Sequence, residues 1–229
     1  MKRKISLKKL LIYVIIVIVL ILASYLFVSS RDIKLNINNE SIWDTDGQSD
    51  KEVSAELQAK RDAAVIKYNE YIEKGLSFKA EGDAGNFDSY QKAIDNFLLA
   101  SEVGEDKFWI PYLNIANTYK AMADYKNAIK NYDKALELSK YGEADIYLSK
   151  IEIYLFAYNA QPSEVMEMYE DAITKVPQNT KIMGQYAKYL FDNKEYDRSL
   201  YFYNILLSKF PDFESYKNRV TELNQILNK

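Results

Sequence analysis

Apolar residues follow two different patterns along this chain. Residues 10–28 form one uncharged, almost wholly apolar run, whereas from about residue 50 onward apolar residues recur at spacings of three and four. The second spacing gathers apolar side chains on one face of an α-helix. Only 7 Gly and 4 Pro occur among the 229 residues, too few turn-forming residues for a protein of many short strands. The pattern predicts an all-α protein.

The first apolar run is long enough to cross a membrane. As a helix, residues 10–28 would span about 28 Å, close to the thickness of a bilayer core. The apolar region of a cleavable signal peptide is shorter, about 7–15 residues. We therefore expect an uncleaved signal anchor, while the small residues at 29–30 keep cleavage open as the alternative.

The residues before this run set its expected orientation. Residues 1–9 contain five basic residues and no acid, and such segments stay on the cytoplasmic side. We expect 1–9 to be cytoplasmic and the chain beyond residue 28 to lie outside the cytoplasm. The sequence thus predicts a single-pass cell membrane protein with an extracytoplasmic domain.

A linker is expected between this transmembrane helix and the folded domain. Residues 29–49 show no sustained period, which is typical of a tether. Ser49 and Glu52 then have the spacing of a capping box, in which the serine caps a helix and the glutamate reaches back. The folded domain is predicted over residues 50–229, with its first helix beginning near Asp50.

The folded domain repeats one pattern of large and small residues. Two segments carry it in strict register, at Tyr112, Ala116, Tyr119, Ala128, Tyr132 and Ala135 and again at Met183, Ala187, Leu190, Ser199, Tyr203 and Leu206. Pro177 and Pro211, which close successive units, are 34 residues apart. Less regular copies occupy 71–100, where the turn at 81–90 is about six residues longer than usual, and 147–177.

These positions match the tetratricopeptide pattern W-x2-L-G-x2-Y…A-x3-F…P. Over residues 55–228 the chain resembles the tetratricopeptide repeat family, and its N-terminus gives it the layout of membrane-anchored bacterial members. The resemblance implies an α-solenoid of about four helix pairs with a polar-faced capping helix over 214–228. It also implies that Ala116, Ala128 and Ala135 lie where helices approach most closely.

The amino-acid composition excludes several kinds of chemistry. The chain has no Cys and no His, which removes disulfides, thiolate catalysis and nearly every zinc site. No phosphate-binding glycine loop or nucleophile–base pair occurs, so we expect neither a cofactor nor enzyme activity. Residues 1–31 carry a charge of +6 and the remainder −9. An acidic body disfavours nucleic acid as a partner.

Binding is the remaining class of function. In a tetratricopeptide solenoid the first helix of each unit lines the concave face, and the resemblance places twelve candidate partner-binding residues there. They are Ile72, Leu76 and Lys79 in unit one, Leu113, Asn117 and Lys120 in unit two, Leu148, Glu152 and Leu155 in unit three, and Gly184, Lys188 and Phe191 in unit four. Several of the Leu and Ile residues could instead pack against neighbouring helices.

Two hypotheses for the function follow. The first is a membrane-tethered scaffold whose groove binds a peptide or protein partner outside the cytoplasm. The carboxylate clamp found in some family members is not matched, because Leu113 precedes Asn117 where that clamp has Lys. The alternative is a module that binds a non-protein envelope component such as a glycan, or a secreted binding module released by signal cleavage.

Overall fold

The computed structural model describes residues 55–228, and side chains from residue 58. Within that part the chain is helical and contains no strand, in agreement with the expected all-α class. The helices are α2 (Ala55–Asp83), α3 (Ser89–Val103), α4 (Trp109–Ala121), α5 (Tyr125–Leu138), α6 (Ala144–Phe156), α7 (Pro162–Lys175), α8 (Thr180–Asp192), α9 (Tyr196–Lys209) and α10 (Glu214–Ile226).

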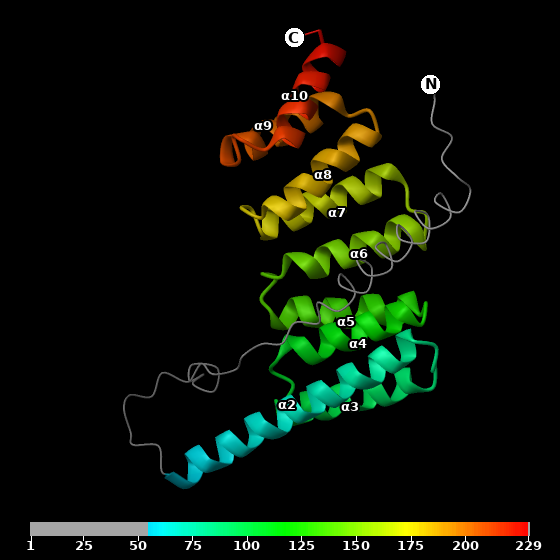
Figure 1. Cartoon of the computed structure of the whole chain (residues 1–229), viewed down its shortest axis with the longest axis vertical. Coiled ribbons are helices and arrows are strands. Elements are labelled where there is room, and N and C mark those ends of the chain that lie inside the picture. The colour runs from blue at the N-terminus through cyan, green and yellow to red at the C-terminus, as the bar shows by residue number, and fades with distance from the viewer. Residues whose placement is uncertain (1–54, 229) are drawn as a thin grey trace, which may run out of the picture. The chain divides into compact units, whose positions relative to one another are not determined.

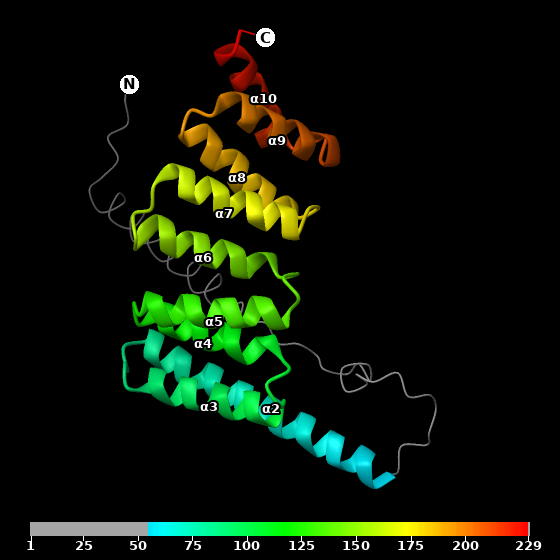
Figure 2. The same ribbon diagram turned by 180° about the vertical axis from the view of Figure 1, so that it is seen from behind.

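The helices form four antiparallel pairs that stack in chain order. Each helix packs on the next, and α2 and α6 also approach the first helices of the following pairs, α4 and α8. Figures 1 and 2 show this stack from opposite sides, with α10 at its C-terminal end. A neighbour is needed on each side because no single pair can bury both of its apolar faces.

Small residues bring α4 and α5 together in the second pair. Ala116, Ala128 and Ala135 are fully buried, as the sequence predicted. Tyr132 lies beside them with no exposed surface, and its hydroxyl donates a hydrogen bond of 2.6 Å to Asn117 Oδ1. Burial raises the pKa of Tyr132, so this phenol stays protonated and keeps donating.

The first pair differs from the expected one in its turn. The sequence predicted a long turn over 81–90, but α2 continues to Asp83 and only residues 84–88 connect it to α3. Two glycines let α3 pack closely on this longer helix, because Gly75 lies against the ring of Phe97 and Gly82 against the ring of Tyr90. A Cβ at either glycine would come within about 2.5 Å of a ring carbon. Both rings therefore pack directly on the α2 backbone.

The third pair is more open than the others. At the positions where the other pairs have Gly75, Ala116 and Ala187, α6 has Ile151, and α7 has Val165 opposite it. Both side chains are almost completely buried, and α6 and α7 approach each other less closely than the helices of the other pairs. Branched side chains in the contact push helix axes apart.

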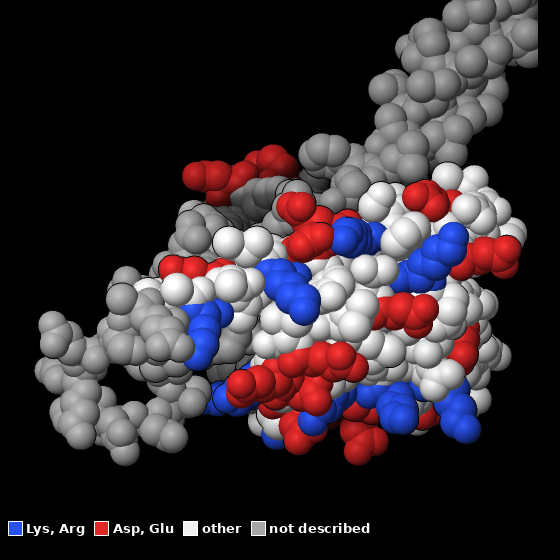
Figure 3. All heavy atoms as spheres, turned by 90° about the horizontal axis from the view of Figure 1, so that it is seen from below, with Lys and Arg blue, Asp and Glu red and all other residues white. Residues whose placement is uncertain are grey.

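The last helix covers the end of the stack, as predicted. Leu223 is fully buried against α9, and Tyr216 packs beside it with its ring 5.9 Å from that of Tyr203. The other face of α10 is polar and exposed. At the opposite end, formed by α2 and α3, Figure 3 shows acidic and basic side chains interspersed with uncharged surface.

Several expectations lie outside the described residues. These are the cytoplasmic segment 1–9, the transmembrane helix 10–28, the linker 29–49 and the capping box at Ser49 and Glu52. Among the described helices, none is both long and apolar enough to span a bilayer.

Candidate partner-binding groove

The candidate groove runs across the first helices of the pairs. On α6, Asp145, Leu148, Glu152 and Leu155 are spaced by three and four residues and so share one face of the helix. That face is bordered on both sides, because Lys120 of α4 contacts Glu152 with its ammonium 2.6 Å from the carboxylate. On the other side Lys181 of α8 pairs with Asp145. These ion pairs show that α4, α6 and α8 lie side by side along one surface.

Four of the twelve predicted groove residues are core residues rather than surface. Ile72, Leu113 and Leu148 are buried, and Leu113 and Leu148 belong to the central hydrophobic cluster. The ammonium of Lys79 is buried and bonds Asp83 at 2.8 Å. These four side chains contribute to packing within the fold. They therefore expose little surface that a partner could contact.

The charged members on the surface are paired within the chain. Lys120 pairs with Glu152, and Lys188 pairs with Asp192 on its own helix. Asn117 accepts the hydrogen bond of Tyr132. Because these pairs are exposed, each contributes little to stability, and a partner could exchange them at small cost.

Two apolar members pack against other parts of the fold. Leu155, like Leu76, is half-buried, and it packs against the central cluster. Phe191 packs edge-on against Tyr196, and the guanidinium of Arg219 from α10 lies 3.9 Å from the centre of its ring. Leu155 and Phe191 are therefore partly engaged in packing and only partly available to a partner.

Gly184 faces the C-terminal helices. A Cβ added there would meet the hydroxyl of Tyr216 at 3.7 Å and a methyl of Leu206 at 4.0 Å. Alanine would fit in ordinary contact, but a longer side chain would meet α10. The space beside this glycine is therefore bounded by the capping helix.

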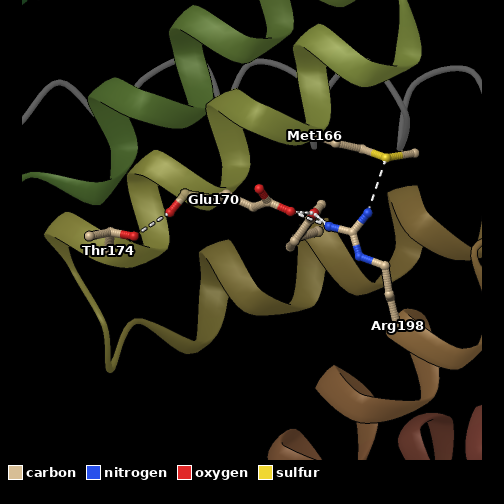
Figure 4. A network of polar contacts seen from close by, with 5 residues as sticks. Met166, Glu170, Thr174 and Arg198 are labelled. Carbon is tan, nitrogen blue, oxygen red and sulfur yellow. Dashed lines mark hydrogen bonds and ion pairs between the residues drawn. The ribbon is translucent and has the colours of Figure 1, made fainter.

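A polar network fixes α8 between α7 and α9. Arg198 of α9 bonds Glu170 of α7 and the hydroxyl of Tyr186 of α8, and that hydroxyl donates to Glu170 at 2.8 Å. Figure 4 shows Arg198 reaching from α9 toward Glu170, with its second nitrogen near the sulfur of Met166. Burial and the bond to Glu170 raise the pKa of Tyr186. The network holds the helix that carries Gly184, Lys188 and Phe191.

The main feature that the sequence analysis missed is Phe156. It is the last residue of α6, follows Leu155 on the groove face, and is 82% exposed. Among the exposed large apolar residues of the described part, it has the greatest exposure. The signal in the sequence was the position of Phe156 at the end of the helix, just after Leu155. No further turn of the same helix follows that could cover its aromatic ring.

Comparisons with known proteins give only distant structural likenesses. No family model matches the chain, and no curated protein matches it. Among solved structures, the chain is similar to MamA at 14% identity, with 69% of this chain and 81% of that one covered and a TM-score of 0.49.

Two further solved structures are named as tetratricopeptide proteins. YrrB, described as having an unusual peptide-binding site, is similar at 16% identity with 69% of this chain and 76% of that one covered and a TM-score of 0.44. A protein of Thermus thermophilus is similar at 14% identity with 68% and 98% covered and a TM-score of 0.41. At these TM-scores the likenesses support no conclusion by themselves. The description of a stack of helix pairs rests on the packing and the repeat residues of this chain.

Proposed function

We propose that this protein is a membrane-tethered tetratricopeptide scaffold that binds a segment of a partner protein on its first-helix face, outside the cytoplasm. The observation that carries the proposal is the 82% exposed Phe156 beside half-buried Leu155, at the end of the α6 face that the ion pairs border. A large aromatic side chain left exposed to water beside a polar-rimmed surface is a typical anchor for a partner. No enzyme activity is part of this proposal.

The form of the surface favours a peptide segment. Apolar groups at the end of α6 would bury the anchor side chains of an extended or helical segment. The paired charges of Lys120, Glu152 and Lys188 form a polar rim that can exchange partners. Stacked exposed aromatic rings would favour the glycan alternative, but many of the tyrosines are buried, namely Tyr68, Tyr90, Tyr132, Tyr147, Tyr169, Tyr186 and Tyr203. In the described part, no observation favours it over a peptide.

Site-specific photocrosslinking in cells tests the binding face. A photoreactive residue in place of Phe156 in the full chain should form a discrete adduct with one partner. The matched control replaces Tyr201, which is 62% exposed on α9, a second helix. Equal adducts from both positions, or an adduct from Tyr201 alone, would place binding elsewhere.

A reporter fusion tests the tether. A reporter that is active only outside the cytoplasm, fused after Lys229, should be active if residues 1–9 stay inside. An inactive reporter on a full-length, membrane-inserted protein would contradict this orientation. A product shortened by about thirty residues would favour signal cleavage.

A further inference from the structure

A second possible binding site lies in the open third pair, apart from the groove. A cavity of about 210 Å³ opens between α6 and α7. Tyr147 and Ile151 line it from α6 and Met168 lines it from α7, so its floor is mainly apolar. The branched Ile151 and Val165 that separate these helices account for the space. Small-molecule sites usually measure about 300–1,000 Å³, so this cavity suits a single side chain better than a whole ligand.

Three carboxylates stand around this floor. Glu164, Glu167 and Asp171 also line the cavity, and their spacing of three and four places them along one face of α7. Among the described residues, no side-chain hydrogen bond or ion pair is made by any of the three. Like charges at such spacings repel one another. The rim therefore carries three carboxylates that, within the part of the chain that the structure describes, have no ion-pair partner of their own.

The cation that could have neutralised the rim is engaged elsewhere. Lys150 of α6 lines the same cavity, but its ammonium bonds Asp133 of α5. Tyr147 also stays uncharged, because burial, with a smaller effect of Asp171, raises its pKa to about 12. The cavity thus combines an apolar floor with an unbalanced acidic rim.

We infer that this cavity, which we call the α7 pocket, binds a lysine or arginine side chain of a basic segment in a partner protein. Lysine and arginine bury a hydrocarbon stem along apolar surface and keep the charged head among polar groups. Ile151 and Met168 would contact the stem, and the carboxylates of Glu167 and Asp171 would face the head. A bare metal ion would gain nothing from the apolar floor. The inference does not depend on the groove proposed above.

Binding of a labelled peptide to the full chain tests the α7 pocket. The probe is a fluorescent peptide of alternating lysine and serine, and anisotropy reports its affinity. Glu167→Gln with Asp171→Asn should weaken binding about five- to tenfold, as expected for losing two partly exposed ion pairs. The matched control, Glu102→Gln with Asp88→Asn, removes the same charge from exposed positions of the first pair and should leave the affinity unchanged. Equal loss in both variants would overturn the inference.

A second peptide tests the hydrocarbon stem of the lysine side chain separately from its charge. A peptide with 2,4-diaminobutyrate in place of lysine keeps the charge but shortens the stem, and it should bind several-fold more weakly. Equal affinity for the two peptides would show diffuse attraction to an acidic surface and would overturn the pocket.

A third variant fills the pocket from within. Met168→Lys should place a cation among the carboxylates and abolish peptide binding. The Glu167→Gln and Asp171→Asn pair should not lower the melting temperature, because repulsion is relieved. A lower melting temperature in that pair, or binding that persists in Met168→Lys, would show that the carboxylates serve the fold rather than a ligand.

Discussion

At the scale of single residues, the exposed and buried residues of the repeat have different roles in packing. The fully buried Ala128 allows α4 and α5 to approach, and no larger residue fits without moving an axis. Lys130, two residues on, is exposed. The sequence pattern distinguishes these two positions because core residues recur at fixed spacings in the repeat.

Replacing Ala128 should therefore overpack the second pair. Ala128→Leu is expected to lower the free energy of unfolding by about 1–3 kcal/mol, measured by urea unfolding of the purified chain with helical circular dichroism as the signal. Lys130→Leu is the control and should change little. Equal effects of the two substitutions would mean that the repeat register is wrong.

At the scale of elements, the third pair shows how one position changes helix packing. Ile151 stands where the other pairs have Gly or Ala, and with Val165 it fills a wider gap between α6 and α7. The repeat pattern alone would make alanine the better residue at 151. The structure gives the opposite expectation, because the surrounding side chains are arranged around the larger group.

The substitution Ile151→Ala tests whether alanine or isoleucine is the more stabilising residue at this position. The substitution should leave a cavity and lower the free energy of unfolding by about 2–5 kcal/mol. Ala116→Gly, at the matching position of the second pair, is the control and should cost only about 1 kcal/mol, the difference in helix propensity. A neutral or stabilising effect of Ile151→Ala would mean that α6 and α7 close up when the branched side chain is removed.

At the scale of the whole molecule, buried tyrosines link stability to pH. Burial raises the pKa of Tyr90, Tyr147 and Tyr169 to about 12, whereas in an unfolded chain a tyrosine ionises near pH 10. The folded state therefore holds these protons more tightly than the unfolded state. The resulting stability is complete below about pH 10 and is lost as the pH rises toward about 12.

An alkaline titration should show cooperative unfolding in that window. Tyrosinate absorbance and loss of helical circular dichroism should rise together above about pH 10. Tyr169→Phe removes one buried ionisable group and should move the midpoint upward. Tyr201→Phe, at a 62% exposed position, should leave it in place. Ionisation of all tyrosines before any helix is lost would contradict the expectation.

The sequence by itself determined the helical class, the register of the repeats and the closing helix. Each of these follows from spacing along a helix, which is a local property. Ala116, Ala128 and Ala135 are buried as predicted, because the repeat places small residues where helices approach closely. The anchor at residues 10–28 and the linker remain predictions from the sequence alone.

Only the tertiary structure decided which of these side chains remain available to a partner. Lys79 and Leu113 were expected in the groove, but neighbouring helices bury them, and Arg219 of α10 covers Phe191 from another unit. Likewise, among the described residues, the carboxylates of the α7 pocket have no ion-pair partner because Lys150 pairs with Asp133 on a different helix. Exposure and pairing depend on contacts between residues far apart in the chain, and spacing within one helix carries no information about them.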